Sequence, residues 1–360
     1  MKLSKQAKFA ILTCTIIFVI AMLYVGKYQF ASYYNKQGIV YYNLKEYDKA
    51  LANYNKAIAL NPNDAAAYYN RGKLYHELKD YDKALANYNK AIALNPNLSQ
   101  AYINRGIVYA EREDYDKALA DYNQAIALNP NDAAAYNNRG IVYAKLQEYD
   151  KAIANFDKAI ALNPNYSEAY NNRGFLYYNL KEYDKALANY NKAIALNPND
   201  AAAYYNRGNL YHELKDYDKA LANYNKAIAL NPNDATAYYN RGVVYEKLEE
   251  YDKAIANFDK AIELNPNLVE AYNNRGVVYE KLKDYAKSLA DYNKAIELNP
   301  NYAKAYYNRG NVYANLKKYY KALADFDKAI ELNPYNTQAY NNNEVLYKKF
   351  VLSLYLMNLR

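Results

Sequence analysis

The chain has 360 residues, of which 23% are charged and 52% hydrophobic, and a formal net charge of +8 at pH 7. Six of these eight net charges lie outside residues 31–336, because four lysines precede that range without an acidic residue, and Lys348, Lys349 and Arg360 follow it against Glu344 alone. The long central region is therefore close to neutral, which excludes the dense basic surface that binds a nucleic-acid backbone. We expect no nucleic-acid partner.

The first 30 residues differ in composition from the rest of the chain. Residues 9–25 form a run of 17 residues without a charge, which would span roughly 25 Å as a helix, close to the thickness of a hydrocarbon core. Lysines precede the run, which favours a cytoplasmic N-terminus and places the remaining chain across the membrane. We therefore expect residues 1–30 to be a transmembrane signal anchor of a single-pass membrane protein whose residues 31–360 are extracytoplasmic.

The same segment permits a second interpretation. Val19-Ile20-Ala21 has the small-residue spacing of a cleavage site, so a removed signal and a secreted or periplasmic product remain an alternative. The apolar run continues past this site, which favours retention. Cys14 is the only cysteine and is expected to be a small buried apolar side chain, so no disulfide framework is predicted.

A strict period of 34 residues follows. Asn-Pro pairs recur at this interval and account for all nine prolines, at Pro62, Pro96, Pro130, Pro164, Pro198, Pro232, Pro266, Pro300 and Pro334. Nine of the ten glycines keep the same interval, from Gly38 to Gly310. A fixed period of this length indicates a repeat architecture.

Each repeat predicts two helices. With Ala65 as position 1, Tyr68, Gly72 and Tyr75 share one helical face, and Asp64 is placed to cap a first helix over residues 65–78. A second apolar stripe over residues 81–94 ends at Asn95-Pro96, because the residue before proline is disfavoured in a helix. The small residues Gly72 and Ala84 lie on facing stripes, so the two helices are expected to pack closely and antiparallel.

These spacings resemble the tetratricopeptide repeat family, whose pattern has an aromatic residue at position 4, Gly at 8, Tyr at 11, Ala at 20, an aromatic residue at 24, Ala at 27 and Pro at 32. In the repeat from Ala65 these are Tyr68, Gly72, Tyr75, Ala84, Tyr88, Ala91 and Pro96. The resemblance covers residues 31–336 as nine repeats. It implies an all-α, right-handed superhelical solenoid of antiparallel helix pairs.

The chain departs from the family at position 7, where an apolar residue is usual and this chain has arginine from Arg71 to Arg309. We expect the arginine stem to lie along apolar surface and its guanidinium to reach an acid or a carbonyl oxygen, which is a structural role.

Positions 6 and 9 of the first helices point away from the partner helix. In the family such positions line the concave groove that contacts ligand. Position 6 is asparagine at Asn70, Asn104, Asn138, Asn172, Asn206, Asn240, Asn274 and Asn308. An amide side chain matches the peptide unit of an extended chain, and the row is similar to the asparagine ladder of the glycosyltransferases that add N-acetylglucosamine to proteins. Position 9 adds apolar candidates at Ile107, Ile141, Phe175, Val243 and Val277. Alternatively, position 9 packs against the next repeat and the asparagines are merely tolerated.

Other functions have weaker support. The carboxylate clamp of chaperone-binding members needs Lys at position 5 and Arg at position 6 of particular repeats, and no repeat from residue 65 onward has either. His76 and His212, the only histidines, have no neighbouring ligand residues in the sequence, so we predict no metal, cofactor or catalysis. The sequence predicts a scaffold that binds proteins or peptides; a glycan-binding or cell-envelope subunit is the alternative, since the 49 tyrosines offer ring faces.

Residues 337–360 form a partial tenth repeat. Glu344 replaces the glycine of position 8, and residues 350–357 are largely apolar. We expect a final helix that packs on repeat nine; the alternative is that its apolar surface meets a partner, a second copy or the membrane.

Overall fold

The computed structural model describes residues 26–358, and the predicted membrane segment at residues 9–25 lies outside this range. The chain divides into two compact units that meet between Leu176 and Tyr177, and each unit is described here by itself. Every regular element of the described residues is an α-helix, which confirms the all-α prediction. None of these helices combines the length and the apolar composition needed to cross a bilayer.

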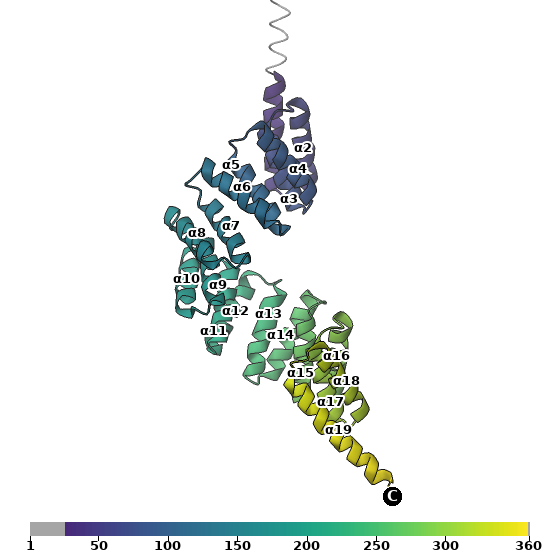
Figure 1. Ribbon diagram of the computed structural model, residues 1–360. Coiled ribbons are helices and arrows are strands. Elements are labelled where there is room, and N and C mark those ends of the chain that lie inside the picture. Colours follow the sequence, from purple (N-terminus) through teal and green to yellow (C-terminus); the bar gives the residue numbers. More distant parts are fainter. Residues whose placement is uncertain (1–25, 359–360) are drawn as a thin grey trace, which may run out of the picture. The chain divides into compact units, whose positions relative to one another are not determined.

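The first unit begins with a helix over residues 26–43 and continues as alternating second and first helices of successive repeats (Figure 1). Its further elements are α2 (Tyr47–Leu60), α3 (Ala65–Glu77), α4 (Tyr81–Leu94), α5 (Ser99–Glu111), α6 (Tyr115–Leu128), α7 (Ala133–Lys145), α8 (Tyr149–Leu162) and α9 (Ser167–Asn179), the last of which crosses the boundary.

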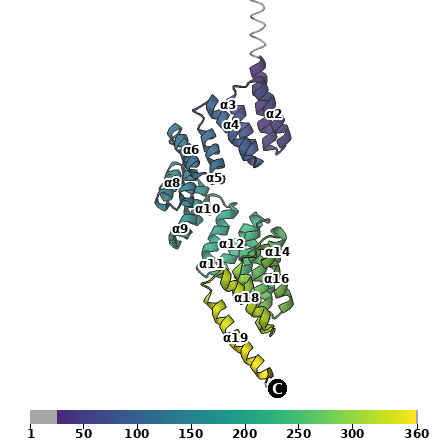
Figure 2. The same cartoon turned by 45° about the vertical axis from the view of Figure 1, so that its right-hand side comes forward.

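The second unit has the same alternation. Its helices are α10 (Tyr183–Leu196), α11 (Ala201–Glu213), α12 (Tyr217–Leu230), α13 (Ala235–Lys247), α14 (Tyr251–Leu264), α15 (Val269–Lys281), α16 (Tyr285–Leu298), α17 (Ala303–Asn315), α18 (Tyr319–Leu332) and α19 (Thr337–Asn358). Figures 1 and 2 show the two helices of a repeat side by side in each unit, as the predicted helix pairs require.

Local signals set the ends of the helices. The Asp64 carboxylate accepts hydrogen bonds from the backbone N–H groups of Ala66 and Ala67 at 3.0 and 3.2 Å, as predicted for an N-cap. The second helix α4 ends at Asn95, which is extended with φ −140° and ψ 90° ahead of the proline. Between the helices of a repeat, position 15 has a positive φ in every described repeat, although it is never glycine; Lys79 has φ 59°.

A similar hydrophobic cluster forms at each junction between one repeat and the next. Ala84 and Tyr88 of α4 pack with Val108 of α5 from the next repeat, and all three are fully buried. Gly72 faces the Tyr88 ring: a Cβ added there would lie 2.7 Å from Tyr88 Cε1, inside contact distance. The small residue predicted at position 8 is therefore needed to admit the ring at position 24, rather than to meet Ala84.

The helix α19 packs against α18. Its Leu346 is 6% exposed and joins a cluster with Ala322 and Phe326, as the first of the two predictions for this segment requires. Val345 and Tyr347 remain exposed. The side chains at 350 and 352–358, which carry most of the apolar sequence, lie outside the described residues, so the predicted self-association stays a prediction.

Candidate binding surface on the first helices

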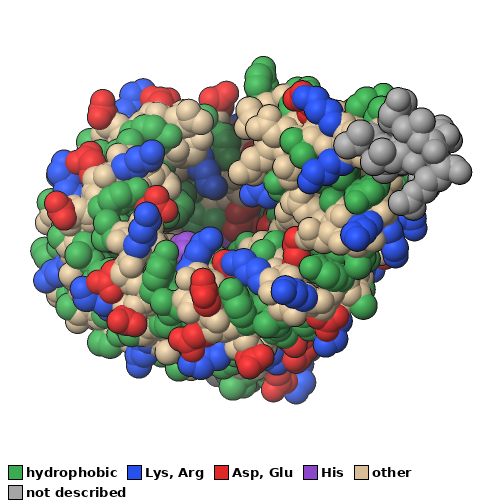
Figure 3. Space-filling view, turned by 90° about the horizontal axis from the view of Figure 1, so that it is seen from below, with side chains coloured by type: hydrophobic (Ala, Val, Ile, Leu, Met, Phe, Trp, Pro, Cys, Tyr) green, Lys and Arg blue, Asp and Glu red, His purple; other side chains and the backbone are tan. Residues whose placement is uncertain are grey.

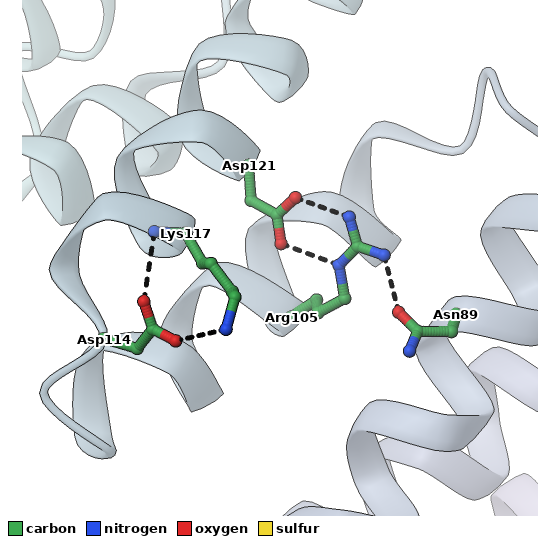
Figure 4. A network of polar contacts seen from close by, with 5 residues as sticks. All are labelled: Asn89, Arg105, Asp114, Lys117 and Asp121. Carbon is green, nitrogen blue, oxygen red and sulfur yellow. Dashed lines mark hydrogen bonds and ion pairs between the residues drawn. The ribbon is translucent and has the colours of Figure 1, made fainter.

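The position 7 arginines join three helices. Arg105 of α5 donates from Nε and Nη2 to the two carboxylate oxygens of Asp121 in its own second helix, at 2.8 and 2.6 Å, and from Nη1 to Asn89 Oδ1 in α4 of the preceding repeat, at 2.6 Å (Figure 4). Asp121 is 5% exposed, so this ion pair is largely desolvated. The same bridge uses amide oxygens in other repeats, for example from Arg139 to Asn155 and Asn123. The predicted structural role is confirmed.

The position 6 asparagines connect neighbouring first helices. Asn104 Nδ2 donates to the Tyr69 hydroxyl at 3.0 Å, and Asn274 Nδ2 to the Tyr239 hydroxyl at 2.9 Å; in each pair the acceptor is position 5 of the preceding repeat. The same bond recurs at Asn70, Asn172, Asn240, Asn308 and Asn342. Burial raises the pKa of Tyr69 and raises that of Tyr239 to about 12, so both hydroxyls are neutral at pH 7. All eight predicted asparagines, Asn206 included, are half-buried.

Asn138 is the exception in this row. Position 5 of the preceding repeat is Ile103, which offers no acceptor. Asn138 Oδ1 accepts a long hydrogen bond of 3.4 Å from Asn137 Nδ2, but among the described residues Asn138 Nδ2 donates to none. Ile103 was not among the predicted site residues, although position 5 changes there from Tyr or Asn to Ile.

The position 9 side chains are divided between packing and exposure. Ile107 packs against the core of its junction, beside Tyr122 of α6 and Val142 of α7, and Val243 packs beside Phe258 and Val278. Ile141 and Val277 are half-buried, whereas Phe175 is 48% exposed. The alternative that position 9 packs against the next repeat therefore describes Ile107 and Val243 better than Phe175.

A pocket of about 370 Å³ lies at the junction of repeats three and four. It brings together three of the predicted residues, Ile107 of α5 and Asn138 and Ile141 of α7. Its remaining wall includes Ala110, Glu111, Glu113, Tyr115, Tyr122, Val142 and Lys145. The volume falls at the lower end of the range of about 300–1,000 Å³ in which small ligands bind.

The equivalent junction between α17 and α19 forms a pocket of about 430 Å³ with different chemistry. Polar side chains dominate its wall, including Glu280, Asn311, Asn315 and Asn342. Asn342 Nδ2 donates to the Tyr307 hydroxyl and to Asn311 Oδ1, so its amide hydrogens are engaged within the protein.

The surface charge is mixed. Figure 3 shows basic and acidic side chains interspersed on the visible face, without an extended area of one sign. His76 Nε2 lies 2.9 Å from Glu111 Oε2, whereas burial and nearby Lys247 lower the pKa of His212. Within residues 26–358, no three His, Cys, Asp or Glu side chains are grouped to hold a metal ion.

Two solved structures show the same fold, and a third is similar in sequence. The chain is 18% identical to the APC/C hetero-tetramer Cut9–Hcn1, covering 88% of this chain and 76% of that one with a TM-score of 0.60. It is 23% identical to a tetratricopeptide repeat protein from Parabacteroides merdae, covering 69% and 98% with a TM-score of 0.52. It is 32% identical to YrrB, described as a tetratricopeptide repeat protein with an unusual peptide-binding site, covering 52% and 97% with a TM-score of 0.45.

No curated protein matches the sequence. Four models of the tetratricopeptide repeat do match it. They cover residues 38–79, 176–215 and 208–249; 65–98, 235–268, 269–302 and 303–336; 106–171; and 87–120 and 155–188. Together these matches run without a gap from residue 38 to residue 336, and the chain therefore belongs to the tetratricopeptide repeat family.

Proposed function

We propose that this protein is a non-catalytic scaffold that binds extended peptide or protein segments on the surface formed by its first helices. The observation that carries this proposal is the pocket between α5 and α7, where apolar side chains lie beside the Asn138 amide, whose N–H groups have no acceptor among the described residues. An extended peptide offers both an apolar side chain and a backbone carbonyl at one place.

The other position 6 asparagines support the same function. Each amide has two N–H donors and an oxygen acceptor, and the bond from Asn104 or Asn274 to the preceding repeat occupies one donor. Both side chains are half-buried, and the bond to the neighbouring helix fixes their direction; the Asn274 oxygen also accepts from Asn273 Nδ2 at 3.0 Å. Such pre-organisation reduces the ordering cost of binding. Asn240 donates to both Tyr205 and Asn209, so it is expected to contribute less.

Peptide selection tests the proposal. Short peptides would be selected from a random displayed library against the full chain, and their site mapped by hydrogen exchange. We expect protection of the first helices. The triple variant Asn138→Ala, Asn172→Ala, Asn206→Ala should weaken binding more than tenfold, since each lost hydrogen bond is worth about 0.5–1.5 kcal/mol. The matched control replaces three exposed turn asparagines, Asn63, Asn131 and Asn199, by Ala. Protection confined to second helices, or equal loss in both triples, would refute the proposal.

We further propose that residues 9–25 tether this scaffold to a membrane, with the N-terminus cytoplasmic and the repeats on the other side. The uncharged run and the lysines ahead of it support this topology. The full chain should stay in the membrane fraction after carbonate extraction, and a chain that begins at residue 31 should be released. Release of both forms, or protease access to the repeats from the cytoplasmic side, would contradict the tether.

A further inference from the structure

We propose that the junction of repeats three and four is the selective subsite of the binding surface, and that it takes an extended peptide with an acidic residue two positions from an aliphatic one. This inference rests on the proposed function and names the chemistry that the site recognises. Its residues come from α5 and α7, within the first unit.

The Asn138 amide provides a hydrogen-bond donor in this pocket. At the other junctions with a described bond, a Tyr hydroxyl or an Asn oxygen at position 5 accepts the hydrogen bond from the next asparagine. Ile103 removes that acceptor and is itself only 7% exposed, packed in the core of the junction. Asn138 therefore presents a half-buried N–H pair to the pocket. A backbone carbonyl of a bound peptide would satisfy it.

Aliphatic side chains line both sides of the pocket. Ile107 and Ala110 from α5 face Ile141 and Val142 from α7 across the same pocket. Position 9 is aliphatic on both sides of this junction, whereas in repeat nine it is Asn311. A branched aliphatic side chain buries its surface here without leaving a polar group unpaired.

Lys145 brings a positive charge to the pocket. Asn138, Ile141 and Lys145 follow one another at intervals of three and four residues, so they form one stripe along α7. Lys145 makes no ion pair within the described residues. Of the two carboxylates on the opposite wall, Glu111 is engaged by His76 and Glu113 is exposed to solvent. A peptide lying along α7 thus meets a hydrogen-bond donor, an apolar side chain and a free ammonium group in turn. The ammonium selects a carboxylate two residues from the aliphatic one, because alternate side chains of an extended peptide share a face about 6.6 Å apart, close to the rise of roughly 6 Å from Ile141 to Lys145.

The test uses substitutions that occur naturally at position 5. Ile103→Asn and Ile103→Tyr each return an acceptor to Asn138, as Asn137 and Tyr69 do for their neighbours. Random-library peptides selected on the full wild-type chain should be enriched in aliphatic and acidic residues two positions apart. Both variants should weaken the best such peptide about fivefold in fluorescence anisotropy, within the range expected for one hydrogen bond. Ile103→Leu and Tyr69→Asn are matched controls that should leave its affinity unchanged.

Further measurements separate the parts of the inference. Asn138→Ala should lower affinity in the wild-type chain but not in the Ile103→Asn chain, because the amide is already engaged there. Lys145→Glu should weaken the acidic peptide and leave its Asp→Ala counterpart unchanged. Equal binding by wild type and both acceptor variants, or protection mapped away from α5 and α7, would overturn this subsite while leaving the scaffold function intact. Failure to select any peptide would instead refute the proposed function.

Discussion

Repeats two and six provide a matched pair in which one hydrogen bond can be isolated. Their positions 1 to 33 differ only at position 9, which is Lys73 in repeat two and Asn209 in repeat six. The Tyr224 hydroxyl donates to Asn209 Oδ1 at 2.7 Å, whereas the equivalent Tyr88 hydroxyl is buried and finds no partner among the described residues. Both rings are fully buried, so the packing contribution of the two residues is nearly equal.

The same substitution of Tyr by Phe should therefore have different effects on stability at these two positions. Tyr224→Phe removes a satisfied hydrogen bond and should cost about 1 kcal/mol. Tyr88→Phe removes a buried hydroxyl that lacks an acceptor, and should leave stability unchanged or raise it by about 1 kcal/mol. Phenylalanine already occupies this position at Phe156, Phe258 and Phe326, so the ring alone fits the core.

Hydrogen exchange of the amides in α4 and α12 is the suitable assay, because repeat arrays open locally as well as globally. Lys73→Asn supplies the missing acceptor, so in that background Tyr88→Phe should become as costly as Tyr224→Phe. Equal losses for the two tyrosines in the otherwise wild-type chain would show that position 9 does not control the hydroxyl, and would refute the reasoning.

Three other predictions concern the stability of the array. Arg105→Ala leaves the Asp121 carboxylate buried without its cation and should lower the free energy of unfolding in urea by about 3–5 kcal/mol. Arg139→Ala, whose partner Asn155 is neutral, should lower it less, and equal decreases for the two variants would contradict the role of charge. Gly72→Ala should destabilise α3 and α4 by about 1–2 kcal/mol in hydrogen exchange, because the fully buried Tyr88 ring cannot move away from the new methyl group. Gly26→Ala is the control and should leave stability unchanged, because no atom lies within 4 Å of a Cβ added there. Burial raises the pKa of Tyr166 to about 12, above its ordinary value near 10, so the stability that the neutral side chain contributes is complete below pH 10 and is lost as the pH rises to about 12. In an alkaline titration, the absorbance of tyrosinate should therefore rise together with the loss of helix. Ionisation of Tyr166 well before unfolding would disprove the assignment.

The regular part of the fold was predictable because its causes are local. The Asn-Pro pair, the Asp cap and the apolar stripes each act within one repeat, and together they placed α3 and α4 within a residue of their observed ends. The role of Gly72 was predicted only in part, because its partner ring lies 16 residues away and two small residues suggested a simpler contact.

The binding surface was harder to predict because its contacts cross from one repeat to the next. The row of asparagines was visible, but the acceptor of each amide lies 35 residues earlier, at a position that the periodic pattern left undistinguished. Ile103 affects Asn138 only because it provides no acceptor across that contact, so its effect could not be predicted without the packing of one repeat on the next. The partners of Arg105 lie 16 residues to either side; polar residues at positions 23 and 25 of each repeat carried that signal.

The hydrogen bonds that each position 7 arginine makes to two second helices also determine which deletions and insertions the fold can accommodate. Each bridge takes one acceptor from its own repeat and one from whichever repeat precedes it. If residues 99–132 were excised, Arg139 would keep Asn155 and meet Asn89 where it now meets Asn123, since both are asparagine at the same position. The new junction between repeats would keep all hydrogen bonds of the arginine, so deletion or insertion of whole repeats should yield folded proteins of different length. A deletion of any other size would leave the arginine at the new junction without one of its acceptors.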